Sequence, residues 1–475
     1  MLGVLLFLVV ASAPANGKLE KLFVLHRHGA RTSLGVGPGG KLLCNYPYCQ
    51  LTSQGKSMCN ALGRSILDEY VRTGAVELSA IYNVTEMQSV STAVPRVVVS
   101  GEAAVLGLYP DGFPFVDFSP IDEDLGMSFW TSWPTWQIRQ TYDVETVKLD
   151  AYARTLFFDE DLTVLGHQLG IDWCATRPSD CIGFAYDSAV SNTSLGFSLE
   201  PAVASLLEKM HYFMARFFYE MLGYVPSDDY KRAVGAYGNP LGQELMHLLT
   251  SAEINNFQYK IFHRAAHDWT LFPFYGVLGA WNTSNWNDTR WVIQFAEAVI
   301  VELHSGNASE PLIRARWGAP QQDSRTVYEY SWQPLVMRCI APDGQVSHSS
   351  ECPLSYVWRQ INSTMPVNDD PLCFASQSSL REQNCAEPTA PPTNATACRF
   401  FRSRCPNVQC GPVPNSVADA ARDFACVSTD TSTQDALAVG VVVAVGIATL
   451  AIGASVGYLL GGRLEPLFHR WCRKS

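Results

Sequence analysis

The chain has 475 residues, a formal net charge of −11, 47% hydrophobic residues and 11% aromatic residues. That aromatic content excludes intrinsic disorder, because disordered chains are poor in residues that can build a core. The excess of acidic residues argues against a nucleic-acid binder, which needs clustered Lys and Arg to neutralise phosphates. Only one apolar run is long enough to span a bilayer, so a polytopic membrane protein is excluded as well.

The two ends of the chain predict a membrane topology. Residues 2–10 are apolar and are followed by small residues, which is typical of a cleaved signal peptide. Residues 436–462 are uncharged and long enough for a tilted transmembrane helix. The tail after Gly462 carries four basic residues and one acidic residue, a net charge of +3, which leaves −14 for the rest of the chain. Positive flanks stay in the cytoplasm, so we expect a single-pass type I membrane protein whose body is luminal or extracellular.

The predicted transmembrane segment also carries a small-residue pattern. Gly453, Gly457 and Gly461 recur every four residues, a spacing that lets two membrane helices approach closely as a homodimer. The plainer interpretation, which we weigh more heavily, is that glycine is simply common in membrane helices.

Cysteines and glycosylation sequons agree with an oxidising compartment. Of the 14 cysteines, 13 precede the tail, and most of these should form disulfides. Their odd number leaves at least one unpaired, and their spacing does not suggest a metal site. Seven N-x-S/T sequons fit a glycoprotein surface: Asn83, Asn192, Asn282, Asn287, Asn307, Asn362 and Asn394.

The first part of the chain predicts strands and a helix. Residues 21–25 (KLFVL) indicate a buried parallel strand. Residues 51–70 have helical spacing of apolar side chains, with Thr52 as the N-cap. Three consecutive valines at 97–99 predict a second strand.

The second part begins with helices and returns to strands. Residues 201–225 form the clearest amphipathic helix, and Asn239-Pro240 predicts the start of another. Strands are predicted at 259–262 and 298–303, with a helix at 271–278 between them. Alternating strands and helices at both ends, around a helix-rich middle, predict an α/β domain with a helical insertion.

The sharpest local feature is the sequence Arg27-His28-Gly29-Ala30-Arg31, which follows the first predicted strand. Ligands of open α/β sheets bind beyond the carboxyl ends of strands. Arginine forks match phosphate oxygens, a His between them can attack phosphorus, and glycine permits a tight turn. The alternative is a chance basic turn without function.

A second polar pair, His267-Asp268, follows the predicted strand at 259–262. A nucleophilic His expels an alkoxide poorly unless the leaving oxygen receives a proton, so a carboxylic acid should lie nearby. Asp268 is the candidate donor. The two strand-end motifs together point to phosphoryl transfer, which neither does alone.

These motifs resemble the histidine acid phosphatase family, the acid-phosphatase branch of the phosphoglycerate-mutase-like superfamily. The resemblance runs in order over residues 19–110 and 235–305 and includes Leu51-Thr52-x-x-Gly55, Ser91–Arg96 (STAVPR) and Gly107–Pro110 (GLYP). It implies an α/β sandwich domain with an inserted helical cap. It also implies an acid phosphatase that needs no cofactor or metal and hydrolyses phosphomonoesters of small molecules or phosphoproteins.

The resemblance carries over residue by residue onto six positions. His28 matches the nucleophile that forms a phosphohistidine, and Asp268 matches the proton donor. The phosphate-binding positions are matched by Arg27, Arg31, Arg96 and His267. An acid pH optimum follows as a hypothesis, with Asp268 protonated and His267 a better phosphate ligand when protonated.

This interpretation divides the chain into seven segments: signal peptide 1–17, first catalytic part 18–118, helical cap 119–256, second catalytic part 257–379, Cys-rich stalk 380–434, transmembrane helix 435–462 and cytoplasmic tail 463–475. With the predicted topology, the resemblance places the catalytic body in the endosomal–lysosomal lumen or at the cell surface.

Three departures from the family pattern concern substrate preference. Ala30 and Ala93 stand where Asp is common, and Trp269 stands where Thr is usual. Trp269 would either shape the leaving-group pocket or pack the start of a helix. The acidic body argues mildly against highly anionic substrates. Two rival hypotheses are a phosphomutase sharing the RHGxR motif and a catalytically inactive surface glycoprotein of the same fold.

Overall fold

The computed structural model describes residues 17–37, 42–112, 116–119, 135–225, 227, 235–252, 254, 257–280, 292–305, 310–322, 328–365, 408–412 and 424–428. The predicted signal peptide, the transmembrane helix and the tail lie outside these residues, as does most of the stalk. Within the described residues, no helix is both long and apolar enough to cross a membrane.

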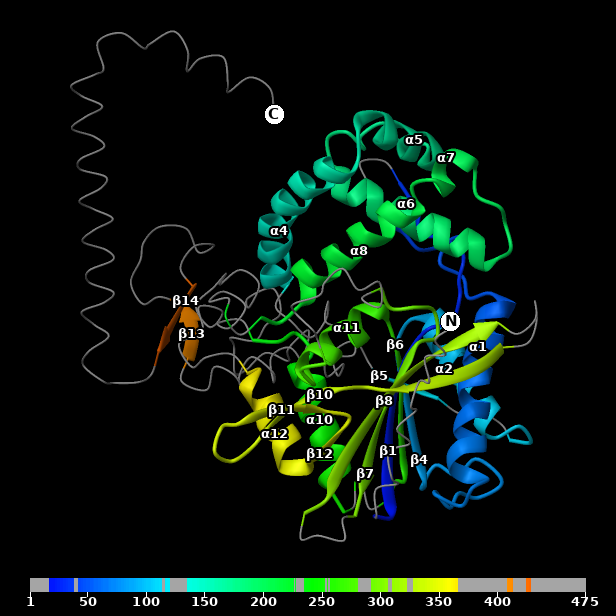
Figure 1. Ribbon diagram of the computed structural model, residues 1–475, viewed down its shortest axis with the longest axis vertical. Coiled ribbons are helices and arrows are strands. Elements are labelled where there is room, and N and C mark those ends of the chain that lie inside the picture. Colours follow the sequence, from blue (N-terminus) through cyan, green and yellow to red (C-terminus); the bar gives the residue numbers. More distant parts are fainter. Residues whose placement is uncertain are drawn as a thin grey trace, which may run out of the picture. The chain divides into compact units, whose positions relative to one another are not determined.

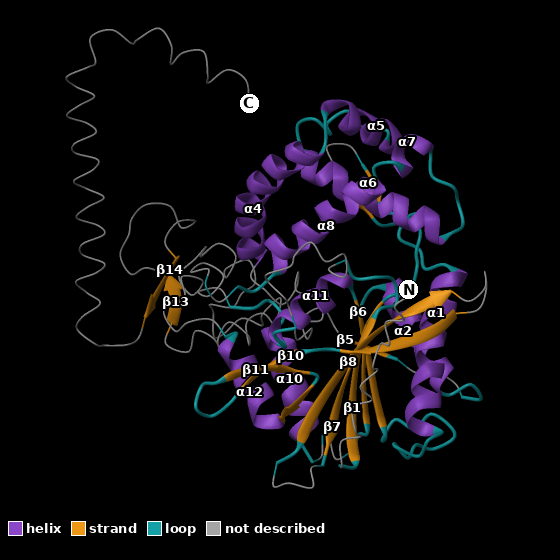
Figure 2. Ribbon diagram, viewed as in Figure 1, coloured by secondary structure: helices purple, strands orange, loops and turns teal. Residues whose placement is uncertain are grey.

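A mixed sheet forms the centre of the fold (Figures 1 and 2). Its strands run in the order β12-β8-β7-β1-β6-β4-β5, and β9 pairs with β8. The strands β1, β6, β4 and β5 are parallel, whereas β7 runs antiparallel to β1. The strand bounds are β1 Leu19–Arg27, β4 Met87–Thr92, β5 Asp117–Ser119, β6 Ile261–Ala266, β7 Ala298–His304, β8 Leu312–Gln322, β9 Tyr328–Pro334 and β12 Glu351–Pro353.

Smaller pairs of strands lie outside this sheet. They are β2 Gly35–Val36 with β3 Leu42–Leu43, β10 Met337–Ile340 with β11 Val346–Ser349, and β13 Val408–Pro412 with β14 Phe424–Ser428. By contact density the chain divides into two compact units, and the larger one, Met1–Pro406 with Cys410–Ala425, holds every element discussed below.

The alternation of side chains along β1 separates two layers of core. Leu22 and Val24 pack on one face with the helices α1 (Ser53–Ile66) and α2 (Pro95–Leu108). Phe23 and Leu25 pack on the opposite face, where α10 Asn239–Thr250, α11 Asp268–Val277 and α12 Leu354–Ser363 lie. Both faces of β1 are buried from Leu22 to Leu25, where its sequence is a continuous apolar run, and β1 pairs in parallel with β6, as predicted.

Helix α1 begins as predicted, because the Thr52 hydroxyl accepts a hydrogen bond from the Gly55 amide at 3.0 Å. The helix continues as a π-helical turn, η2, over Leu67–Val71. The prediction of a strand at 97–99 is wrong, since these valines lie in α2. Pro95 occupies the first turn of α2, where its missing N–H costs nothing, and packing against α1 outweighs the β-propensity of the valines.

The insertion consists of helices that lie beyond one end of the sheet in Figure 1. Its described helices are α4 Thr135–Leu156, α5 Asp159–Leu169, α6 Pro178–Ser194, α7 Pro201–Ala204 and α8 Leu207–Leu222. The helix predicted over 201–225 is therefore interrupted between α7 and α8. On α8, Met210, Phe213 and Phe217 are buried against the neighbouring helices, as its amphipathic pattern indicated.

Disulfides are present, as the cysteine count predicted. The pairs are Cys44–Cys49, Cys174–Cys181 and Cys339–Cys352. Among the described cysteines, Cys59 is free and buried in α1.

Candidate active site

The structure brings the predicted site residues together at the carboxyl ends of three parallel strands. Arg27 ends β1, and His28 follows it. His267 follows β6 as the N-cap of α11, and Asp268 is the first residue of that helix. Arg96 lies in the first turn of α2, after β4. The rings of His28 and His267 meet edge to face with centroids 5.7 Å apart.

The hydrogen bonding of His28 suits a nucleophile. Its Nδ1 lies 2.9 Å from the Gly29 carbonyl, which can only accept, so Nδ1 carries the proton. Burial lowers the pKa of His28 well below its usual value, and the nearby cations Arg96, Arg27 and Arg31 lower it further. A neutral imidazole protonated on Nδ1 keeps the lone pair on Nε2, the atom that would attack phosphorus.

The three arginines are held by protein partners yet keep donors for a ligand. Arg27 donates through Nη1 to the Ile293 carbonyl at 2.6 Å, and its Nη2 lies 2.7 Å from Asp268 Oδ2. The guanidinium of Arg27 also lies 4.3 Å from the ring centre of Phe295. The Nε atoms of Arg27, Arg31 and Arg96 are buried and have no hydrogen-bond partner among the described residues. A phosphoryl group is the kind of ligand that would satisfy all three N–H donors.

The environment of His267 changes one part of the acid-optimum hypothesis. Burial, followed by Arg96, Arg27 and Arg31, lowers the pKa of His267 to about 3. Without a bound anion, His267 is therefore neutral in mildly acidic solution and is not the protonated ligand we predicted. Its Nε2 lies 3.0 Å from the Thr92 hydroxyl at the end of β4, a contact that holds the ring in place.

Gly29 allows a close backbone contact within the protein, rather than a contact with a ligand. A Cβ atom at Gly29 would lie 2.1 Å from the carbonyl oxygen of Gly55, and one at Gly55 would lie 2.1 Å from that of Ala30. The loop after β1 therefore rests directly on the first turn of α1. The glycine in each of the HGAR and LTxxG motifs thus has a packing reason.

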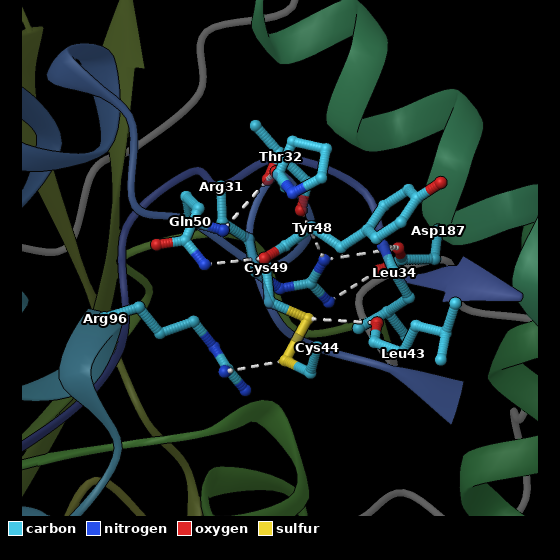
Figure 3. The surroundings of a disulfide bond; sticks show 11 residues. Arg31, Thr32, Leu34, Leu43, Cys44, Tyr48, Cys49, Gln50, Arg96 and Asp187 are labelled. Atoms are coloured by element: carbon cyan, nitrogen blue, oxygen red, sulfur yellow. Dashed lines mark hydrogen bonds and ion pairs between the residues drawn. A yellow bond between two sulfur atoms is a disulfide. The ribbon is translucent and has the colours of Figure 1, made fainter. Parts of the chain in front are cut away.

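Asp187, on cap helix α6, is a site residue that the sequence did not reveal. Its carboxylate accepts two hydrogen bonds from Arg31, with Oδ1 2.6 Å from Nη2 and Oδ2 3.2 Å from Nη1 (Figure 3). Oδ2 also accepts from the Leu34 amide at 2.7 Å. Nothing in the pattern of α6 distinguishes Asp187 from a solvent-facing acid, and no motif marks this part of the chain.

The disulfide Cys44–Cys49 borders the same group of residues (Figure 3). Arg96 Nη1 donates to the Cys44 sulfur at 3.4 Å, and the Cys49 amide donates to the Ser33 carbonyl at 3.1 Å. The short loop that this disulfide closes therefore contacts both Arg96 and the segment that follows Arg31.

Trp269 packs the start of its helix against the cap. Its ring centre lies 5.8 Å from that of Phe217 and 5.5 Å from that of Phe218, both on α8. The packing alternative of the two that the sequence left open is thus present in the structure, and it joins the cap to the sheet domain next to Asp268.

Solved structures share this architecture, although comparison of the sequence alone finds no match. No protein-family model matches the chain, and neither does any curated protein sequence. A Hafnia alvei phytase solved with tartrate superposes with a TM-score of 0.54 and 16% identity, covering 74% of this chain and 98% of the phytase. A Citrobacter braakii phytase superposes with a TM-score of 0.53 and 14% identity, covering 73% and 97%. The chain therefore has the mixed α/β fold of the histidine acid phosphatases, the family that its motifs resemble.

Proposed function

We propose that this protein is an acid phosphatase of the histidine type, which hydrolyses phosphate monoesters through a phosphohistidine on His28. The observation that carries the proposal is the position of His28, which is buried beside three arginines with its Nδ1 held 2.9 Å from the Gly29 carbonyl. The fold shared with phytases supports the same chemistry. We also propose that its architecture is the phosphoglycerate-mutase-like sandwich with an inserted cap.

The first chemical step forms a bond between His28 Nε2 and phosphorus and breaks the bond between phosphorus and the ester oxygen. Arg27, Arg31, Arg96 and His267 hold the phosphoryl oxygens, whose charge spreads as the bonds change. Asp268 gives its proton to the departing alcohol, so the leaving group is released neutral.

The second step returns the enzyme to its starting state. A water oxygen attacks phosphorus and breaks the bond to His28, while the Asp268 carboxylate takes the proton that the water loses. The products are one alcohol and one inorganic phosphate for each ester and water consumed.

The test is hydrolysis of p-nitrophenyl phosphate between pH 4 and 6. We expect the wild type to be active and His28→Ala to lose activity by at least about a thousandfold, since a covalent nucleophile has no substitute. The control is His348→Ala, which alters an exposed His on β11. Activity that survives in His28→Ala, or that requires an added metal ion, would refute the proposal.

We further propose that the predicted signal peptide and transmembrane segment make this a type I membrane protein of the endosomal–lysosomal system or the plasma membrane. The support is the order of the apolar runs, the basic tail and the seven sequons. After expression in cells, the protein should stay in membranes extracted with carbonate and should shrink on glycosidase treatment. Recovery of an unglycosylated protein in the soluble fraction would exclude this topology.

A further inference from the structure

We propose that Asp187 determines specificity, by fixing Arg31 for a single phosphoryl group and by repelling substrates that carry further phosphates. The inference rests on the proposed function, because it concerns which phosphomonoesters the site accepts. Asp187 is a positioning residue, since the groups that would touch the reacting phosphate are those of the sheet domain.

The contacts show how Asp187 orients Arg31. A guanidinium has five N–H donors. The carboxylate of Asp187 takes one from Nη1 and one from Nη2, and the Thr32 carbonyl accepts another from Nη1 at 3.1 Å. What remains is the Nε–H, which is buried and unpartnered, together with the second N–H of Nη2. This edge of Arg31 is left to bind two phosphoryl oxygens.

Asp187 itself is anchored rather than free to leave. It accepts from both Arg31 and the Leu34 amide, and its side chain is 14% exposed. A carboxylate held by three hydrogen bonds keeps its place when a substrate arrives. The cap thus contributes a fixed negative charge next to the cationic cluster.

The charge balance matches one phosphate. Asp187 acts electrostatically on both Arg27 and Arg96, so its charge is felt across the cluster. Three guanidiniums and one Asp187 carboxylate give a net charge of +2 when Asp268 is protonated as the donor. A phosphoryl group that is bound as its dianion balances that charge. Each additional phosphate of a polyphosphorylated ester would lie near the negative Asp187 carboxylate, with no further cation of the cluster to balance its charge.

The experiment compares two substrates, p-nitrophenyl phosphate and myo-inositol hexakisphosphate, at pH 5. In Asp187→Asn we expect the KM for the hexakisphosphate to fall about tenfold, because the repulsion is lost. The KM for p-nitrophenyl phosphate should rise several-fold, because Arg31 loses its bidentate partner. Opposite shifts in the two KM values distinguish this role from structural damage, which would weaken both substrates.

The matched control is Glu208→Gln, which removes one negative charge from an exposed position on α8 of the same cap. If Glu208→Gln reproduces the effect, or if both KM values of Asp187→Asn move in the same direction, the inference is wrong even though the phosphatase function stands. If the wild type hydrolyses neither substrate, the proposed function fails. Calorimetric binding of inorganic phosphate and of the hexakisphosphate then decides the inference, and an unchanged affinity ratio in Asp187→Asn would overturn it.

Discussion

Arg27 Nη2 lies 2.7 Å from Asp268 Oδ2, so the last residue of β1 contacts the first residue of α11. The contact exists because β1 and β6 are adjacent and parallel, which brings their carboxyl ends to one edge of the sheet. It places the proposed proton donor against a proposed phosphate ligand.

The proton-donor role of Asp268 predicts a dependence on the leaving group. Asp268→Asn should lower kcat/KM, which reports only the steps up to formation of the phosphohistidine, by about 10²–10⁴-fold for glycerol phosphate, because an alkoxide needs the proton. The loss for p-nitrophenyl phosphate should be much smaller, since p-nitrophenolate leaves without protonation. Steady-state kinetics on both esters checks this, with Asp343→Asn in an exposed turn as the control. An equal loss for both esters would contradict the role.

The close approach of Gly29 and Gly55 predicts that neither tolerates a side chain. Gly29→Ala places a Cβ 2.1 Å from the Gly55 carbonyl oxygen, so the backbone must move. We expect a loss of about 1–3 kcal/mol in the free energy of unfolding, together with reduced activity. Gly183→Ala is the control, because the nearest heavy atom to its Cβ is Met214 Sδ at 4.0 Å. That change should be neutral or stabilise α6 by up to about 1 kcal/mol. Urea unfolding measures both, and equal effects would count against this account.

Buried histidines predict that stability falls on acidification. Burial is the largest cause that lowers the pKa of His26 to about 4 and of His267 to about 3, and it lowers those of His28 and His263 well below the usual value. As the pH falls from about 6.5 to 5, these histidines become protonated in the unfolded chain but stay neutral in the folded chain. The free energy of unfolding therefore decreases.

One buried carboxyl opposes this trend. Burial raises the pKa of Glu297 to about 7, so its protonation stabilises the fold as the pH falls. Four histidines outweigh one glutamate, and the melting temperature should still drop between pH 7 and 5. Saturating inorganic phosphate should reduce the drop, because an anion beside His28 and His267 favours their protonation. A melting temperature that is flat or rises in this window would show the assignment to be wrong.

The disulfide beside Arg96 predicts a local effect on phosphate binding. Replacing Cys44 and Cys49 by Ser removes the link that holds the Cys44 sulfur against Arg96. We expect the inhibition constant of inorganic phosphate to rise several-fold, because Arg96 loses part of its support. The same replacement of the cap disulfide Cys174–Cys181 should leave that constant unchanged. Identical responses of the two double variants would argue against a role for the first disulfide in the site.

The sequence by itself determined much of the sheet domain and of the group of candidate site residues at its edge. The centre of β1 is a continuous apolar run, and the residues that follow parallel strands meet at one sheet edge, which made Arg27 and His28 predictable. Strand β6 instead continues through the buried polar residues His263 and Arg264 to Ala266, beyond its predicted end at residue 262. The helix start at Thr52 was predictable because capping is a local interaction. The valines at 97–99 led to a wrong prediction of a strand, because their strand propensity is weaker than the packing of α2 against α1. That packing is a tertiary contact that the sequence does not show.

Only the tertiary structure decided what surrounds those residues. Asp187 reaches Arg31 because α6 lies against the loop after β1, and a lone Asp on a helix has no local signature of such a contact. The low pKa of His267 likewise depends on burial beside three arginines from separate elements. Local motifs encode which groups can do chemistry, whereas charge balance and desolvation arise from neighbours far apart in the chain, which come together only on folding.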